Sequence, residues 1–318
     1  MTNDHILVAL STFAESDSSP LDLLKASGRP YTIHRTGKRI TTPELLEAGR
    51  AAGVIVASVE PYDAPTIAAL PELRCISRCG VGTDNVDLAA ARARGIAVFN
   101  TPDVPTAAVA ELALSMFLSL ARALPQQSAL MHERSWKRLE SHLLGALTVG
   151  VIGLGRIGRN VAELTRAFGA KVIGSDPHAG AAWLARTGVE LVPLEKLIAT
   201  ADIVSLHAAR TGGQAQLLDA AAIATMKPGA MLVNLARGGM VDEAALYEAL
   251  KAGRLSGAGL DVFAEEPYAG PLCDLPNVLL TPHSATLPVE TRAAMEYQAV
   301  ENALHFLDSG GPAERRVA

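Results

Sequence analysis

The sequence has little that would suit the protein to nucleic acid or to a membrane. Its 318 residues carry a formal net charge of −5 and no run of Lys or Arg, so it offers no basic surface for nucleic acid. No stretch of about 18 apolar residues occurs. The N-terminus lacks the basic and apolar regions of a signal peptide. We therefore expect no nucleic-acid partner, no membrane-spanning segment and a cytoplasmic location.

Cysteine is also scarce. The three cysteines, Cys75, Cys79 and Cys273, form no CxxC pair. This spacing disfavours a metal centre or a disulfide and agrees with a reducing compartment. We expect all three to be small buried apolar residues, because free cysteine usually is.

The sequence does have a regular alternation of short apolar strands and Ala-rich helical stretches. Such alternation is typical of parallel sheets with helices on their faces, and the length allows two domains. A long helix-like run over Val289–Leu307 follows the last strand. A first series of strands is expected at Ile6–Leu10, Gly53–Ser58, Leu73–Arg78 and Ala97–Asn100, and a second at Leu147–Ile152, Lys171–Ser175, Asp202–Leu206, Ala230–Asn234, Gly257–Leu260 and Val278–Leu280.

A second helix-like run, Pro105–Leu124, is apolar on nearly every side. We expect it to be buried, between domains or between subunits. The polar stretch Gln126–Leu144 that follows resembles an arm. Together they predict a homodimer; the alternative is that the helix is buried within one subunit.

The most specific local motif is the stretch VGVIGLGRIG, Val149–Gly158. An expected strand runs into GxGxxG, and a helix opens behind it. Gly153 permits the tight turn, Gly155 lets the backbone approach a pyrophosphate, and Gly158 lets helix and strand pack closely. Asp176 ends the next strand, where a carboxylate can accept hydrogen bonds from ribose hydroxyls and repel a 2′-phosphate. The motif therefore predicts an NAD site, although a Gly-rich turn without a ligand is the simpler alternative.

The motif also gives the expected layout. The fold class is α/β, with two doubly wound parallel sheets. We expect an NAD-binding Rossmann domain over residues 105–283. It would be inserted into a flavodoxin-like substrate domain made of residues 1–104 and 284–318.

Three charged or titratable residues stand at or just after strand ends. Arg237 follows the apolar strand near Asn234, where an unpaired guanidinium would be costly to bury. Glu266 and His283 follow the next two expected strands. Ligands of open α/β sheets bind beyond the carboxyl ends of the strands, so the three could converge. Each alone has a structural alternative: an internal ion pair, a solvated acid and a packed histidine.

The sequence resembles the D-isomer-specific 2-hydroxyacid dehydrogenases, which include phosphoglycerate dehydrogenases, hydroxypyruvate/glyoxylate reductases and D-lactate dehydrogenases. The resemblance covers most of the chain from about residue 70 to residue 285. It lies in the stretches GVGTDNVDLAAARARGIAVFNTP, VAELALSMFLSLAR, VGVIGLGRIG, DIVSLH, NLARGGMVDE, GAGLDVFAEEP and NVLLTPH, which occur in the family's order.

The resemblance implies an NAD-dependent oxidoreductase that interconverts a 2-oxo acid and a D-2-hydroxy acid. Arg237 would clamp the carboxylate, and His283, oriented by Glu266, would be the acid/base. The remaining implied contacts to the cofactor are Arg156, Ile157, His207, Ala236 and Asp261. The implied substrate-binding residues are Arg78, Cys79, Gly80, Val81 and Gly82.

Some features depart from the family's pattern, and some alternatives stay open. Ala209 stands where proline is usual, Arg210 is unusual nearby, and Ser284-Ala285-Thr286 replaces a Gly-bearing turn. A dinucleotide-sensing corepressor-like protein of the same fold is the main alternative, and a formate- or phosphite-type dehydrogenase is another. Which 2-hydroxy acid is used stays open. A phosphoglycerate enzyme needs several cations, and the sequence nominates only Arg78 and Arg138.

Overall fold

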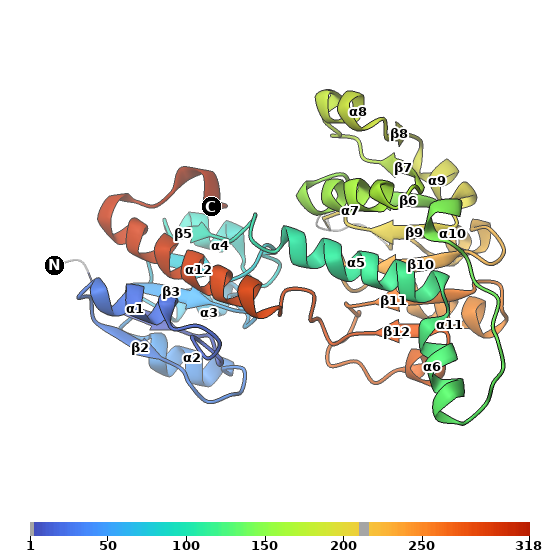
Figure 1. The fold of residues 1–318 in the computed structure, drawn as a ribbon. Coiled ribbons are helices and arrows are strands. Elements are labelled where there is room, and N and C mark those ends of the chain that lie inside the picture. The colour runs from blue at the N-terminus through green and yellow to red at the C-terminus, as the bar shows by residue number, and fades with distance from the viewer. Residues whose placement is uncertain (1–2, 210–215) are drawn as a thin grey trace. The chain divides into compact units, whose positions relative to one another are not determined.

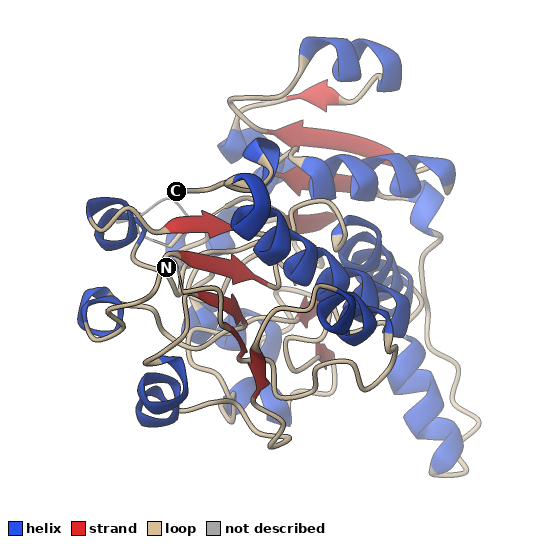
Figure 2. Ribbon diagram, turned by 90° about the vertical axis from the view of Figure 1, so that its left-hand side faces the viewer, coloured by secondary structure: helices blue, strands red, loops and turns tan. Residues whose placement is uncertain are grey.

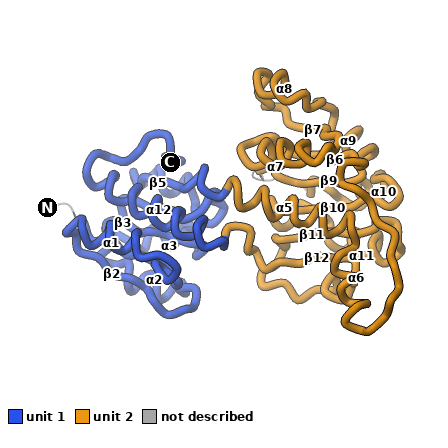
Figure 3. The backbone as a smooth tube through the Cα atoms, in the orientation of Figure 1, with its two compact units in different colours: residues 1–105, 287–318 blue, residues 106–286 orange. Residues whose placement is uncertain are grey.

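The computed structural model describes residues 3–209 and 216–318, so Arg210 lies outside the described residues. The chain divides into two compact units, one of residues Met1–Pro105 and Leu287–Ala318, and one of residues Thr106–Thr286 (Figure 3). Each unit contains one parallel sheet covered by helices (Figures 1 and 2). The predicted fold class is confirmed.

The sheet of unit 1 has five parallel strands in the order β2-β1-β3-β4-β5. This is the flavodoxin-like doubly wound order. Helices α1 and α12 pack on one face, through buried residues such as Leu24 and Met295. Helices α2, α3 and α4 pack on the other, through residues such as Leu45 and Ile67. The bounds are β1 Ile6–Val8, α1 Ser19–Ala26, β2 Tyr31–Ile33, α2 Thr42–Gly49, β3 Val54–Ala57, α3 Ala64–Ala68, β4 Cys75–Arg78, α4 Leu88–Ala93, β5 Ala97–Phe99 and α12 Val289–Ser309.

The sheet of unit 2 has seven parallel strands in the order β12-β11-β10-β9-β6-β7-β8. This is the Rossmann order with one added strand. Helices α5 and α7 cover one face, and α9, α10 and α11 cover the other. The bounds are α5 Thr106–Ala121, α6 Leu124–His132, β6 Thr148–Ile152, α7 Arg156–Ala167, β7 Lys171–Ser175, α8 Ala181–Thr187, β8 Glu190–Leu191, α9 Leu194–Thr200, β9 Ile203–Leu206, α10 Ala220–Thr225, β10 Met231–Asn234, α11 Glu243–Lys251, β11 Gly257–Leu260 and β12 Val278–Leu280.

Helix α5 covers most of the expected run Pro105–Leu124, and a second helix, α6, lies mainly in the polar stretch after it. Helix α5 ends at Ala121, Ala123 adopts a left-handed conformation with φ 47°, and α6 turns away by 61°. No single helix of the described chain is long and apolar enough to cross a membrane; only this bent pair passes that test together. The apolar residues of α5 pack within unit 2, against α7, β10 and β11. Much of the apolar surface of α5 is therefore buried within the subunit, which is the alternative stated above.

The cysteine prediction needs one correction. Cys75 and Cys79 are buried, but Cys273 is exposed in the short 3-10 turn Pro271–Asp274, and all three are free thiols. The loop after β11 carries this turn at the surface, which leaves the thiol outside the core. The described residues hold no cluster of three or more His, Cys, Asp or Glu side chains that could bind a metal ion.

Candidate functional site at the carboxyl edge of the unit 2 sheet

The Gly-rich turn joins β6 to α7. Gly153 has φ +87°, and a Cβ there would lie 2.6 Å from the backbone of Ala208; a Cβ at Gly158 would lie 1.9 Å from the carbonyl oxygen of Gly153. The fold itself therefore requires these two glycines. Gly155 differs, because a Cβ there would meet no described atom within 4 Å. Its missing side chain leaves open space beside the N-terminus of α7, which suits an approaching phosphate group.

Asp176, directly after β7, holds the Gly-rich turn. Its carboxylate accepts a hydrogen bond from the amide of Leu154 at 2.6 Å and one from the amide of His178 at 2.7 Å. Arg156 and Ile157 follow as the first residues of α7. The predicted cofactor residues that follow β6 and β7 thus meet at the Gly-rich turn.

His207 follows β9, the strand beside β6. Its Nε2 lies 2.8 Å from the hydroxyl of Ser205, and its Nδ1 is buried without a partner in the described part of the chain. Burial lowers the pKa of His207 to about 4. The ring is therefore neutral at neutral pH and offers one uncharged nitrogen at the switch point, where the strand order reverses between β6 and β9.

Arg237 lies in the turn after β10. Asn234 shapes this turn, accepting from the amide of Ala236 at 3.0 Å and donating to the carbonyl of Arg237 at 3.0 Å. The guanidinium of Arg237 donates to the carbonyl of Ala236 at 2.7 Å. A Cβ on Gly238 would lie 1.7 Å from the carbonyl oxygen of Phe263, so this turn packs directly on the loop after β11.

Glu266 and His283 meet across the loops that follow β11 and β12. His283 Nδ1 lies 2.9 Å from Glu266 Oε2, while Glu266 Oε1 accepts from the amide of Phe263 at 3.1 Å. The side chains are partly open, with 49% and 38% of their surfaces exposed. The carboxylate occupies Nδ1, so Nε2 is the ring nitrogen left to exchange a proton with a ligand. The structure thus brings Glu266 and His283 together and packs the Arg237 turn against the loop that carries Glu266.

Asp261, predicted as a cofactor residue, is buried at the end of β11. Its carboxylate accepts from Thr281 Oγ1 at 2.6 Å and from the amides of Ser284 at 2.8 Å and Ala285 at 3.0 Å. All these partners belong to the turn that contains His283. Sequence reasoning missed this link, although the hydroxyl residues flanking His283 were a signal for it.

The predicted substrate loop lies in unit 1. The amide of Cys79 donates to the end of β3 at 2.8 Å, and the amide of Gly80 donates to Thr101 Oγ1 at 2.9 Å. The fold thus uses two of the four amides. Those of Val81 and Gly82 donate to no group among the residues described. The predicted binding of the substrate carboxylate by loop amides is therefore left to the amides of Val81 and Gly82.

Arg78 and Cys79 have different roles in that loop. Arg78 donates through Nη1 to the carbonyl of Cys79 at 2.7 Å, and a Cβ on Gly80 would overlap this guanidinium at 1.3 Å. Gly80 thus leaves room for the arginine. Burial raises the pKa of the Cys79 thiol to about 11, so the thiol stays protonated and uncharged at neutral pH.

Comparisons with known proteins agree with this geometry. The family model "D-isomer specific 2-hydroxyacid dehydrogenase, NAD binding domain" matches residues 114–285. D-3-phosphoglycerate dehydrogenase of Mycobacterium tuberculosis is 44% identical over 294 residues, which cover 88% of this chain and 56% of that protein. The chain thus spans about half the length of such curated relatives.

Solved structures match over nearly the whole chain. The TT0316 protein from Thermus thermophilus superposes with a TM-score of 0.89 at 37% identity, covering 99% of this chain and 100% of its own. A D-lactate dehydrogenase from Aquifex aeolicus, complexed with NAD and lactic acid, superposes with a TM-score of 0.84 at 27% identity, covering 96% of each chain.

Proposed function

Because the chain belongs to the D-isomer-specific 2-hydroxyacid dehydrogenase family, we propose that it is an NAD-dependent dehydrogenase interconverting a 2-oxo acid and a D-2-hydroxy acid. The observation that carries the proposal is the 2.9 Å contact between His283 Nδ1 and Glu266, beside the Arg237 turn at the carboxyl edge of an NAD-binding sheet. The corepressor-like alternative requires none of these three side chains, and no described feature favours it.

The Gly-rich turn fits the cofactor. Gly155 leaves space at the N-terminus of α7 for a pyrophosphate. Asp176 contacts the same turn, where its carboxylate would accept hydrogen bonds from the ribose hydroxyls. When bound, NADH supplies the hydride. Neutral His207 and the residues Arg156, Ile157 and Ala236 remain proposed contacts.

The side chains of this protein supply orientation, charge and a proton. Arg237 offers a fork of donors to the substrate carboxylate and polarises the carbonyl oxygen as negative charge develops on it. Protonated His283 donates its Nε2 proton to that oxygen during reduction and accepts a proton there during oxidation. Glu266 holds the ring through Nδ1, which leaves Nε2 as the nitrogen that exchanges the proton. In unit 1, the amides of Val81 and Gly82 remain proposed contacts to a substrate carboxylate.

We propose NAD rather than NADP because Asp176 would repel a 2′-phosphate. NADH should give the higher kcat/KM in the unmutated protein, and Asp176→Ala should narrow the difference. Initial rates with both cofactors measure this. Equal kcat/KM values for NADH and NADPH before mutation would remove the basis for the preference.

The substrate test is a panel of 2-oxo acids with NADH, followed by absorbance. We would include glyoxylate, pyruvate, hydroxypyruvate and 3-phosphohydroxypyruvate, with formate and phosphite plus NAD as the opposite arm. The proposal requires a 2-oxo acid to be reduced in an Arg237-dependent manner, with Arg237→Lys as the matched variant that keeps the charge but loses the fork. If only formate or phosphite were oxidised, the protein would instead be a formate- or phosphite-type dehydrogenase.

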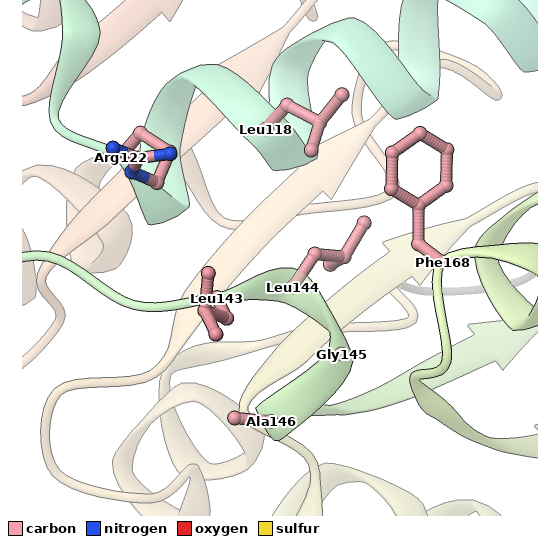
Figure 4. Close-up of a pocket in the computed structure, with 7 residues that line it drawn as sticks. All are labelled: Leu118, Arg122, Leu143, Leu144, Gly145, Ala146 and Phe168. Atoms are coloured by element: carbon pink, nitrogen blue, oxygen red, sulfur yellow. The ribbon is translucent and has the colours of Figure 1, made fainter.

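We further propose a cytoplasmic homodimer. Helix α6 and the segment before β6 expose large apolar side chains, including Leu124, Met131 and Leu143 at 49%, 54% and 71%. Beside Leu143 lies a largely apolar pocket of about 450 Å³ (Figure 4). Exposed apolar groups of this kind often mark a subunit interface. The pocket is lined by Leu118, Arg122, Leu143, Leu144, Gly145, Ala146 and Phe168.

A further inference from the structure

The turn that carries His283 is built around one buried carboxylate. Asp261 has 1% of its surface exposed. Its Oδ1 accepts from Thr281 Oγ1 at 2.6 Å and from the Ser284 amide at 2.8 Å, and its Oδ2 accepts from the Ala285 amide at 3.0 Å. A longer contact, 3.4 Å, comes from the hydroxyl of Ser284. The carboxylate therefore contacts residues on both sides of His283.

His283 itself has a backbone that needs such support. Its φ is +50°, in the left-handed region that non-glycine residues rarely occupy, and its amide donates to the carbonyl of Thr281 at 3.0 Å. Strained residues of this kind persist only when their surroundings fix them. The Asp261 contacts begin at Thr281 and resume at Ser284, so they close the turn around the strained residue.

The direction of the imidazole follows from this backbone. In the left-handed conformation Nδ1 of His283 lies 2.9 Å from Glu266 Oε2. If the turn relaxed to an ordinary conformation, the Cα–Cβ bond would swing and the ring would leave Glu266. The contact is made by two partly exposed side chains, so their mutual attraction alone is too weak to hold the turn.

We propose that Asp261 is a positioning residue for the reaction, acting through the 281–285 turn to hold His283 against Glu266. This rests on the proposed dehydrogenase function for its effect on turnover, but the effect on the ring can be measured without turnover. It assigns the carboxylate a role distinct from the predicted contact with the cofactor. Ser284 and Ala285, which replace the usual Gly-bearing turn, contribute the two amides that bind it.

The test compares variants that remove single acceptor or donor groups. Thr281→Val removes the 2.6 Å donor at nearly constant shape, and Thr281→Ser restores a hydroxyl. Asp261→Asn puts an amide donor in the carboxylate's place, which would oppose one of the backbone N–H groups. Ser284→Ala removes only the 3.4 Å contact and is the matched control.

Three quantities are measured on each variant: the His283 tautomer by ¹⁵N NMR, turnover of NADH with a 2-oxo acid, and the Kd for NADH. The His283 signal is identified by its loss in His283→Gln. The neutral His283 ring should carry its proton on Nδ1 in the unmutated protein and in the variants Thr281→Ser and Ser284→Ala. In the variants Thr281→Val and Asp261→Asn, the tautomer should shift toward the Nε2–H form of free imidazole. Turnover should fall by up to about 10²-fold, as for a misplaced reacting group, with the Kd for NADH nearly unchanged.

Two results would overturn the proposal. One is an unchanged tautomer in a folded Thr281→Val protein. The other is a loss of NADH affinity as large as the loss of turnover, which would make Asp261 a cofactor ligand instead. If Asp261→Asn does not fold, the Thr281→Val and Thr281→Ser pair still decides. If no 2-oxo acid is reduced by the unmutated protein, the proposed function fails, while the tautomer comparison still tests the positioning role.

Discussion

Glu266 and His283 are the proposed acid/base pair, with His283 as the acid/base and Glu266 as the carboxylate that orients it. Glu266→Gln keeps the shape but replaces the carboxylate at Nδ1 with a neutral amide, which is a weaker hydrogen-bond acceptor. The ring is then held less firmly, so reduction and oxidation should both slow, by up to about 10²-fold. Initial rates in both directions measure this.

The control for that experiment is His283→Ala, which removes the proposed acid/base itself. It should lower turnover by about 10²–10⁴-fold at every pH, the usual effect of losing a positioned acid/base. The Kd for NADH should hardly change, because the proposed cofactor contacts lie mainly in the Gly153–Gly158 turn. Unchanged rates in Glu266→Gln would show that the carboxylate does not act on His283, whatever the effect of His283→Ala.

His207 predicts a second pH effect, on stability. Its pKa is about 4 in the folded protein against 6.5 for an ordinary histidine. The unfolded chain takes up the proton first, so stability is full above 6.5 and is lost as pH falls toward 4. At about pH 5 this amounts to roughly 2 kcal/mol. Urea unfolding at neutral and acid pH should show a smaller acid loss in His207→Gln. His178→Gln, at an exposed position, is the matched control and should keep the full loss.

Single residues also show where sequence reasoning stopped. The pairing of Glu266 with His283 followed from a resemblance, and the structure places the two side chains 2.9 Å apart. The contacts of Asp261 did not follow, because they depend on how the ends of β11 and β12 meet in space. Cys273 was expected to be buried, since the sequence does not show that its loop turns outward.

The β6–α7 element gives a matched pair of glycine variants. Gly158→Ala would place a Cβ 1.9 Å from a backbone oxygen, so α7 must shift away from β6. We expect a loss of about 1–3 kcal/mol in stability, as for other overpacked sites, together with weaker NADH binding. Gly155→Ala meets no described atom within 4 Å and has an ordinary φ of −71°. Its stability should change by less than about 1 kcal/mol, while NADH affinity falls.

Thermal unfolding and fluorescence titration with NADH separate the two cases. If Gly155→Ala binds NADH as tightly as the unmutated protein, the cofactor does not approach the backbone at this turn. If Gly158→Ala keeps full stability, α7 can move without cost and the close packing has been overestimated. Both measurements therefore test how β6, the Gly-rich turn and α7 fit together, and not the role of one side chain.

At the level of elements, the periodicity of the sequence predicted the helices and strands that are long or strongly apolar. The ten expected strands are present, most with ends that differ by one or two residues. Strands β2 and β8 were missed. Each has two or three residues, none of them fully buried, so neither carries an apolar run. Helix α6 was also missed: most of it lies in the stretch Gln126–Leu144, predicted as a polar arm, and it has no buried residue that would give it an apolar face.

At the scale of the whole molecule, the nested connectivity explains why one family model covers a central part of the chain. The chain enters unit 2 after Pro105 and leaves it at Thr286, and residues 114–285 match the NAD-binding domain. Helix α12, which follows, packs on β3 and β4 of unit 1. The N- and C-terminal parts of the sequence therefore build one core together, which a boundary drawn by position along the chain would miss.

The assembly of whole molecules is the remaining prediction. Leu143 and Phe168 line the pocket shown in Figure 4 and have 71% and 50% of their surfaces exposed. Burying both in a partner would remove this apolar surface from water. We expect the mass of a dimer by light scattering at micromolar protein, and Leu143→Asp should shift it toward the monomer, since an unpaired buried carboxylate is costly. Leu191→Asp changes an apolar residue on β8 with 42% exposure and should leave the dimer intact. A monomeric mass for the unmutated protein, or equal dissociation by both substitutions, would refute an interface at this pocket.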